Sequence, residues 1–373
     1  MRRIEAFDRF PGVGKIAVLR AIAVGDFVVS LPALESLRLA YPKAEIVLLG
    51  RPWMLSFCKG RSLPFDRVEA VPFSKGVNDA GPEDLRVLEL FIERMRSERF
   101  DLAVQMHGGG RNSNPLTLRL GAGVTVGMRT PDAPELDRWI PYITWQPEVL
   151  RCLEVAALAG ARAVATVPRF QAEASDLDEA LKYLRSDMAC AVLNPGAGNK
   201  RRRWPPERFA QVGDALAARG AVVYINGTAE ERDECRMVAS AMRNPSIDLS
   251  GSLSLNGLVG LLSRADLLVS NDTGTLHLAR ALECPTVGIY WCGNAIHFGL
   301  VSVARHTIYI SWRMNCPACG AHCMYDAPCS HDVSFVDDIP AAEVLEGALQ
   351  LFDRHMRRNP GITAMTSLSS VSP

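Results

Sequence analysis

The stretch SNDTGTLHLARAL, residues 270–282, follows directly on the apolar run ADLLVS. A short buried strand thus ends in Asn-Asp-Thr-Gly and continues at once into a predicted helix, TLHLARALECP. Asp272 and Thr273 belong to the residue types that cap helices, so a capped tight turn is one interpretation. The other is an anion site, in which the free N–H groups of the helix start bind a phosphate and Gly274 lets the ligand approach.

The same alternation of strands and helices runs through the rest of the chain, in two halves. The first half contains the strand patterns KIAVLRA, AEIVLLG, FDLAVQM and VTVGM, with helices expected over 26–42, 82–98 and 148–161. After a connector around Pro168 the pattern restarts with MACAVLNPG, PPERFAQVGDALAARG, AVVYINGT, DLLVSND and CPTVGIYW. This alternation predicts an α/β fold with two Rossmann-like halves, each built on a largely parallel sheet.

Length and composition agree with a two-domain globular protein. With 373 residues the chain is too long for one ordinary core. We expect domains over 1–167 and 168–340, a helix over 341–356, and a disordered tail over 357–373, whose sequence is rich in Ser, Thr and Pro. Lys plus Arg number 41 and Asp plus Glu number 41, so no net field attracts nucleic acid.

The apolar segments are too short to cross a membrane. None approaches the roughly 20 residues that a transmembrane helix needs. The N-terminal sequence MRRIEAFDRF lacks the apolar core of a signal peptide. The expected location is therefore the cytoplasm, with at most peripheral contact at the inner membrane face.

Polar, glycine-containing segments follow four of the predicted strands. They read AVGDFVVSLPAL, LNPGAGNKRRRWPPERF, INGTAEERDE and SNDTGTLHLA. Open parallel sheets bind their ligands beyond the carboxyl ends of the strands. Two halves that face each other would bring all four segments to one cleft, which favours ligand binding over capping alone.

Three of these segments, in this order and spacing, resemble glycosyltransferase family 9, the ADP-heptose:lipopolysaccharide heptosyltransferases. The similarity covers about residues 15–345, and its strongest element is the Asp-Thr-Gly-x-x-His of residues 272–277. The resemblance implies a GT-B type fold, in which two Rossmann-like domains face each other across a cleft. It also implies that the N-terminal domain binds the acceptor and the C-terminal domain binds the nucleotide-sugar donor.

The activity that the resemblance implies is an inverting, metal-independent sugar transfer that requires no cofactor. The donor would be ADP-heptose and the acceptor a lipopolysaccharide core or another glycan. Two other functions stay open from the sequence: a nucleotide-sugar hydrolase or epimerase of the same fold, and a non-catalytic nucleotide-sugar binding protein.

Asp26, in the pair Gly25-Asp26 after the first strand, matches the catalytic aspartate of the family. Its implied role is general base, which takes the proton of the acceptor hydroxyl as that oxygen attacks the sugar. The alternative is a helix-capping aspartate. A binding module would need no such carboxylate, so Asp26 separates the functional classes.

The resemblance assigns a set of C-terminal residues to donor binding. They are Asn194, Gly196, Lys200, Arg202, Glu231, Asp272, Thr273, Gly274 and His277. Arg202 departs from the family pattern, which commonly has Lys two residues before Trp-Pro. Alternatives remain open here too: the run 200–203 is also typical of a solvated surface, and Glu231 of an exposed helical position.

Two further groups of residues complete the expectations. In HGGGRN, after a predicted strand, His107 and Arg111 are candidates for the acceptor side. The segment 316–331 contains Cys316, Cys319, Cys323 and Cys329, together with two histidines. A structural zinc or iron–sulfur site, reduced thiols and a disulfide all remain possible interpretations. In each of them we expect this segment to be structural and remote from the chemistry.

Overall fold

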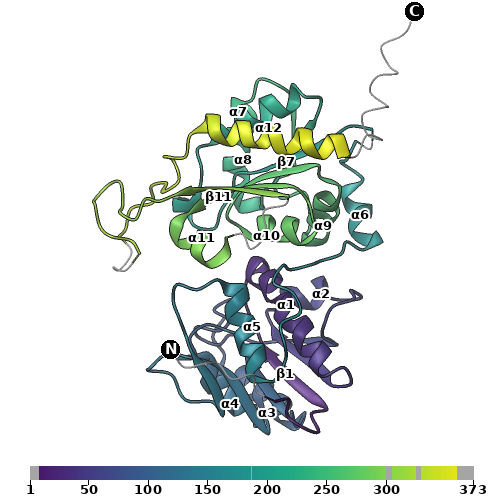
Figure 1. Cartoon of the computed structure of the whole chain (residues 1–373), viewed down its shortest axis with the longest axis vertical. Coiled ribbons are helices and arrows are strands. Elements are labelled where there is room, and N and C mark those ends of the chain that lie inside the picture. The colour runs from purple at the N-terminus through teal and green to yellow at the C-terminus, as the bar shows by residue number, and fades with distance from the viewer. Residues whose placement is uncertain (1–7, 186, 300–304, 325–328, 359–373) are drawn as a thin grey trace, which may run out of the picture. The chain divides into compact units, whose positions relative to one another are not determined.

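The computed structural model describes residues 8–185, 187–299, 305–324 and 329–358 (Figure 1). The chain forms two compact units, Met1–Pro168 and Arg169–Pro373. Each unit has its own parallel sheet. Of the tail predicted to be disordered, residues 359–373 lie outside the described part of the chain, whereas Arg357 and Arg358 belong to the last helix.

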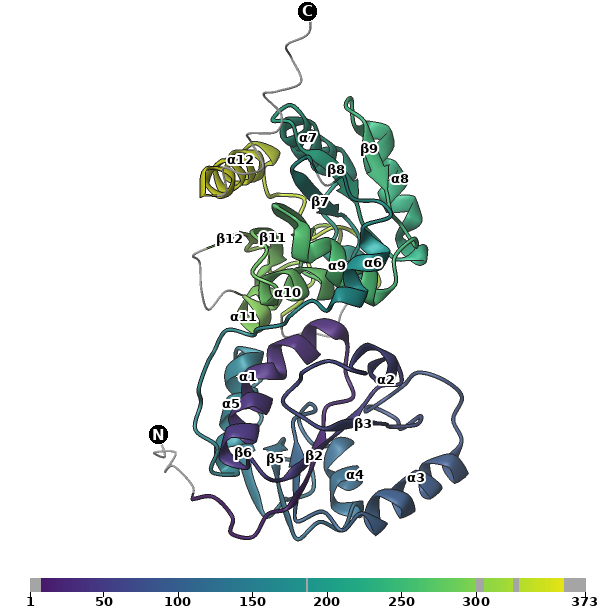
Figure 2. The ribbon, with the colours of Figure 1, turned by 90° about the vertical axis from the view of Figure 1, so that its right-hand side faces the viewer.

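The first unit is built on a parallel sheet of six strands in the order β3-β2-β1-β4-β5-β6. Its strands are β1 (Lys15–Leu19), β2 (Glu45–Gly50), β3 (Arg67–Ala70), β4 (Leu102–Gln105), β5 (Val124–Arg129) and β6 (Arg138–Pro141). Its helices are α1 (Val24–Ala40), α2 (Trp53–Phe57), α3 (Leu85–Ser97), α4 (Ser113–Arg119) and α5 (Glu148–Leu158). Figure 2 shows α1 and α5 on one face of this sheet and α3 and α4 on the other.

The central strands are apolar because both of their faces are covered. In β1, Ile16, Ala17 and Val18 are fully buried, and β4 is buried along its whole length. Amphipathic α3 packs Phe91, Ile92 and Met95 against one face. The α3 helix begins where the Asp84 side chain accepts hydrogen bonds from two backbone N–H groups.

The second unit repeats the same topology, with the strand order β12-β11-β10-β7-β8-β9. Its strands are β7 (Cys190–Asn194), β8 (Val222–Ile225), β9 (Ser246–Asp248), β10 (Leu267–Asn271), β11 (Thr286–Trp291) and β12 (His306–Ser311). Its helices are α6 (Ala174–Ala180), η1 (Lys200–Arg202), α7 (Pro206–Ala217), η2 (Ala229–Glu231), α8 (Arg232–Ala241), α9 (Leu255–Arg264), α10 (Gly274–Ala281), α11 (Cys292–Phe298) and α12 (Ala341–Arg358).

The predicted α/β class with two Rossmann-like units is confirmed, because each sheet is parallel and has helices on both faces (Figure 2). The edge strands β6, β9 and β12 were not predicted from the sequence. Nor was a helix predicted for the stretch after the connector, where α6 forms. Among the described residues, no helix combines the length and the hydrophobicity needed to cross a membrane.

The strand order locates a ligand site in each unit. In the first sheet the direction of strand addition reverses between β1 and β4, and in the second between β7 and β10. Loops that leave the carboxyl ends of such neighbouring strands diverge and open a crevice. The segments after β1 and β4, and after β7, β8 and β10, are therefore the ones that define candidate sites.

Candidate functional site

The turn between β10 and α10 is organised around a buried carboxylate. Asp272 is 1% exposed, and its Oδ1 lies 3.1 Å from Nε2 of His277. Arg202 donates from Nη1 to the backbone oxygen of Asp272 at 3.2 Å and to its Oδ2 at 3.3 Å. A cation and an imidazole therefore hold this carboxylate in place, and neither of its oxygens is used to cap the helix.

Thr273 occupies the N-cap position of α10, but its side chain makes no capping bond. Its Oγ1 instead lies 3.4 Å from Nδ2 of Asn194 and 3.5 Å from the hydroxyl of Ser270. Thr273 thus stands at the N-cap position, as the capping interpretation expects, but without the side-chain hydrogen bond of a capped helix. What remains is a helix start whose backbone N–H groups carry a partial positive charge.

Residues from three neighbouring strand ends meet beside this turn. Asn194, the last residue of β7, accepts a hydrogen bond from Nδ2 of Asn226, after β8, at 2.8 Å. A Cβ on Gly196 would lie 2.2 Å from the carboxyl carbon of Glu231, so the two residues are in close contact. Oε2 of Glu231 accepts from the N–H of Thr228 at 3.0 Å, which orients the carboxylate. The predicted donor residues thus gather at one edge of the second sheet.

Each side chain of the cationic run 200–203 has its own partner, so the run is not simply a solvated surface. Lys200 is exposed, and its Nζ lies 4.0 Å from Asp332. Arg202 bonds Asp272, as described above, and Arg203 forms an ion pair with Glu234. Arg202 therefore supplies a fixed cation at the β10–α10 turn.

In the first unit, Asp26 lies at the start of α1, next to the end of β1. It is the third residue of the helix, and the N-cap is Ala23, which makes no side-chain cap. The Asp26 side chain is 25% exposed, and its Oδ1 lies 3.9 Å from Nη2 of Arg20. The carboxylate is thus partly accessible and lies beside the buried cation of Arg20.

Arg20, which the sequence patterns did not indicate, is the centre of a buried charge network. Its guanidinium donates to the backbone oxygens of Asp26 and Met106 and forms an ion pair of 2.8 Å with Glu148. Glu148 in turn pairs with Arg151. Burial alone would lower the pKa of Arg20, but Cys152, Glu148 and Asp26 raise it, so the cation persists.

The segment after β4 forms a pocket of about 310 Å³ within the first unit. Its lining comprises Gly76, the segment 107–113, Thr130, Asp132 and Tyr142. Both predicted acceptor residues are part of it. Arg111 is exposed and lies 3.5 Å from Asp132, whereas burial and then the Arg20 charge lower the pKa of His107 to about 4. At neutral pH the pocket therefore presents a neutral imidazole and an accessible guanidinium.

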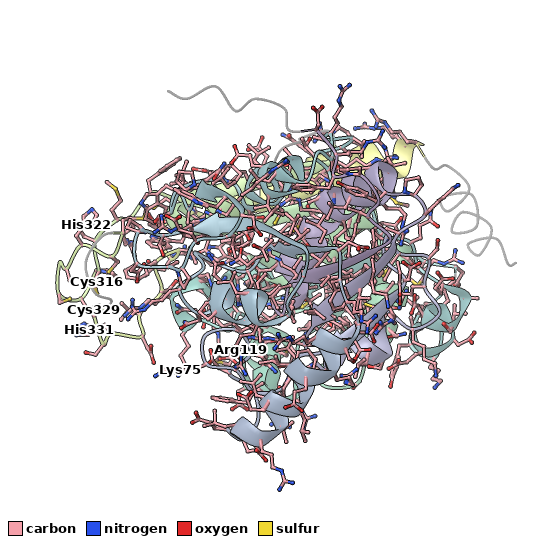
Figure 3. All side chains as sticks on the ribbon, turned by 90° about the horizontal axis from the view of Figure 1, so that it is seen from below. Lys75, Arg119, Cys316, His322, Cys329 and His331 are labelled. Atoms are coloured by element: carbon pink, nitrogen blue, oxygen red, sulfur yellow. The ribbon has the colours of Figure 1, made fainter. Side chains whose placement is uncertain are left out.

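Three of the four predicted cysteines come together in the segment after β12. The thiols of Cys316, Cys319 and Cys329 and a ring nitrogen of His331 all lie within 4.8 Å of one another. In Figure 3 the labelled Cys316, Cys329 and His331 lie in one loop region. Cys323 is not a member of this group, and its Sγ donates to the carbonyl of Ala321 at 3.3 Å. We call the group of three cysteines and one histidine the Cys3His cluster.

The backbone around Cys316 is arranged to stabilise a thiolate. The N–H of Gly320, at φ +74°, donates to the Cys316 carbonyl at 2.8 Å and closes a tight turn. Burial alone would raise the pKa of the Cys316 thiol, but the N–H groups of Ala318 and Cys319 and neighbouring thiols lower it to about 6. All ten cysteines are free thiols in the structure, so the disulfide interpretation is not supported.

Comparisons with known proteins agree with this fold. Two Rossmann-like units of this topology are typical of the GT-B fold. Residues 89–326 match the family model described as glycosyltransferase family 9 (heptosyltransferase), and the chain belongs to this family. The resemblance seen in the sequence and the expected GT-B fold class are thereby confirmed.

Individual relatives are distant in sequence. The chain is 24% identical to lipopolysaccharide heptosyltransferase 2 of Salmonella typhimurium over 298 residues, which cover 74% of this chain and 82% of that protein. It is 28% identical to lipooligosaccharide heptosyltransferase 2 of Haemophilus influenzae over 128 residues, 33% of this chain, but spans only 37% of the length of that relative.

Two solved structures share the fold. The E. coli ADP-heptose lps heptosyltransferase II superposes with a TM-score of 0.69 at 18% identity, covering 91% of this chain and 99% of the other. The iron-containing dodecameric glycosyltransferase TibC from enterotoxigenic E. coli superposes with a TM-score of 0.51 at 13% identity, covering 93% of this chain and 78% of the other.

Proposed function

We propose that this chain is an inverting glycosyltransferase that moves heptose from ADP-heptose to a lipopolysaccharide core or a related glycan. Family membership and the names of the relatives support this class of reaction. The observation that carries the proposal is the meeting of Arg202, Asp272 and the start of α10 beside Asn194, at the switch point of the second sheet. Such an arrangement fits a diphosphate and its sugar.

The donor half of the proposal assigns a role to each residue type. Backbone N–H groups of Thr273 and Gly274 face the diphosphate at the helix start. Lys200 and Arg202 neutralise the charge that develops on the departing ADP, so no metal ion is needed for the transfer. Glu231 accepts hydrogen bonds from the ribose hydroxyls, Asn194 orients Thr273, and His277 holds Asp272 for the sugar.

The acceptor half of the proposal lies in the first unit. Asp26 takes the proton from the acceptor hydroxyl as that oxygen forms its bond to the anomeric carbon. The bond from this carbon to the diphosphate oxygen breaks, ADP leaves with the electron pair, and the configuration inverts. Arg20 positions the base, and the pocket that contains His107 and Arg111 binds part of the acceptor. We place the reaction in the cytoplasm, with at most peripheral contact with the inner membrane.

We also propose that the Cys3His cluster holds one structural metal ion. A tetrahedral ion with bonds of about 2.3 Å to sulfur separates its ligand atoms by roughly 3.8 Å, which the cluster can reach with small shifts. Three cysteines and one histidine form a known ligand set for zinc. Iron is the alternative, because the distant structural relative TibC is described as iron-containing. Metal analysis of the purified chain decides between the two.

The test of the main proposal is a transfer assay with a panel of nucleotide sugars. Each donor is incubated with the chain, with and without a lipopolysaccharide core acceptor, and release of the nucleotide diphosphate is followed in the presence of a chelator. The proposal predicts ADP release from ADP-heptose only when the acceptor is present. Release without acceptor would identify a hydrolase, and binding without any release would identify a binding protein.

A further inference from the structure

The Cys3His cluster and the cationic run 200–203 are joined by one side chain, Arg201. Its Nε donates to the backbone oxygen of His331 at 2.9 Å, and its Nη2 donates to the backbone oxygen of Cys329. The same Nη2 lies 3.5 Å from the Cys329 sulfur. One guanidinium thus bonds both cluster residues that are furthest along the chain, and it does so through the fork geometry peculiar to Arg.

Backbone contacts strengthen this connection on both sides of Arg201. The N–H of Phe335 donates to the Arg201 carbonyl at 2.7 Å, and the Arg201 guanidinium lies 5.4 Å from the centre of the Phe335 ring. The hydroxyl of Ser334 donates to the carbonyl of Arg203 at 2.6 Å. The segment that follows the cluster therefore runs alongside the cationic run and is hydrogen-bonded to it.

The other end of the connection is the proposed donor site. Arg201 belongs to the same short 3-10 turn as Lys200 and Arg202, and the Asn199 side chain accepts a bond from the Arg201 N–H. Arg202 continues to Asp272 in the β10–α10 turn. The path from cluster to donor turn lies wholly within the second unit and is made of hydrogen bonds and adjacent residues.

We propose that metal loading of the Cys3His cluster raises the affinity of the donor site for a nucleoside diphosphate, with Arg201 as the positioning residue that couples the two. The inference rests on the proposed donor site and on the proposed metal. A metal ion bound to Cys329 and His331 fixes the direction of their carbonyls, and so fixes Arg201. Without the ion the 3-10 turn is less ordered, and the nucleotide has to order Lys200 and Arg202 when it binds.

Such coupling is reciprocal, because metal and nucleotide share one thermodynamic cycle. If the metal raises the affinity for ADP by a factor, ADP raises the affinity for the metal by the same factor. Couplings of this kind range over about 5- to 150-fold. For a connection made by one guanidinium we expect about tenfold.

The experiment uses the full chain, kept reduced, in a metal-free form and after stoichiometric loading with Zn(II), with unbound ion removed. Calorimetry gives the Kd for ADP in both forms. In parallel, limited trypsin digestion reports cleavage within 200–203 without any nucleotide. Arg201→Gln is the test variant. Arg219→Ala, which removes an arginine paired with Asp353 on the surface of the same unit, is the matched control.

We expect Zn(II) to lower the Kd for ADP about tenfold and to slow cleavage within 200–203, in the wild type and in Arg219→Ala. In Arg201→Gln both differences between the two forms should disappear, although the variant still binds one Zn(II). Equal ADP affinity in the two wild-type forms, or a chain that binds no Zn(II), would overturn the inference. Slowed cleavage combined with no ADP binding in either form would instead overturn the proposed donor chemistry.

Discussion

Replacement of Arg20 by Met should destabilise the first unit far more than a typical substitution. The side chains of Arg20, Asp26, Glu148 and Arg151 form one network whose formal charges cancel, and the side chains of Glu148 and Arg20 are 7% and 1% exposed. Removal of Arg20 leaves a net negative charge in the protein interior. Loss of one partner of a buried ion pair costs about 3–5 kcal/mol of unfolding free energy.

The double variant Arg20→Met/Glu148→Gln provides the control. It restores charge balance, and Arg151 keeps its bonds to backbone oxygens of residues 143, 144 and 146. We expect the double variant to recover at least about 1 kcal/mol of the stability lost in the single variant. Urea unfolding followed by circular dichroism measures both. A single variant within about 1 kcal/mol of the wild type would refute the network as a stabilising unit.

The same variants test Arg20 as the residue that positions Asp26. Displacement of a catalytic group by about 1 Å costs on the order of 100-fold in rate. The double variant should therefore remain slow in transfer even where it is stable, and the pH dependence of its rate should shift because the cation beside Asp26 is gone. A stable double variant with wild-type rate and pH profile would show that Arg20 has no positioning role.

Three further predictions concern single residues. In Gly196→Ala, the new Cβ displaces the Glu231 carboxylate, and calorimetry should show about tenfold weaker ADP binding, whereas an unchanged Kd would remove Glu231 from the donor site. In His277→Ala, Asp272 loses a partner, and ADP binding should weaken by about 1–3 kcal/mol; equal binding would make His277 dispensable. Burial lowers the pKa of His107 to about 4 in the folded protein. Between about pH 6.5 and 4 the unfolded chain therefore binds more protons than the folded one, and the free energy of unfolding falls as the pH falls through that range. His107→Gln should flatten this part of the stability profile, and an identical profile would contradict the buried neutral imidazole.

Much of the fold follows from local sequence patterns. Strands such as β1 and β7 are covered on both faces, so their sequences are continuously apolar and can be recognised without a structure. The edge strand β6 was not recognised, because its sequence RWIP mixes exposed and buried positions and ends in Pro. Helix α6, with the polar sequence ASDLDEA, has too little apolar periodicity to be distinguished from a connector.

In the candidate site, too, residues close in sequence could be grouped in advance, whereas contacts between distant elements could not. The residues of the β10–α10 turn are close in sequence, so their grouping at the start of α10 could be predicted, whereas the contact of Asp272 with His277 is seen only in the structure. The contact of Arg20 with Glu148 depends on how distant elements pack, and no local spacing signals it. The same holds for Arg201 and Cys329, which are far apart in the chain.

The composition of the Cys3His cluster could not be read from spacing either. Cys323 and His331 are both close in sequence to the other ligands. Among the described residues, the thiol of Cys323 bonds the carbonyl of Ala321 and His331 joins Cys329, and no spacing in the sequence indicates this difference. The hydrogen bonds of Arg201 to the backbone of Cys329 and His331 connect the cysteine segment with the run 200–203. No pattern in the sequence indicates these bonds, so the segment was expected to lie apart from the donor residues.

The proposed transfer reaction depends most on Asp26 as the base that deprotonates the acceptor. Asp26→Asn keeps the shape of the side chain but removes its ability to accept the proton. The most direct measurement compares transfer rate and ADP affinity on one preparation of this variant. We expect a rate about 10² to 10⁴ times lower than that of the wild type. The Kd for ADP should stay unchanged, because Asp26 belongs to the first unit and the donor residues to the second. A near-wild-type rate would contradict the assignment of Asp26 as the base.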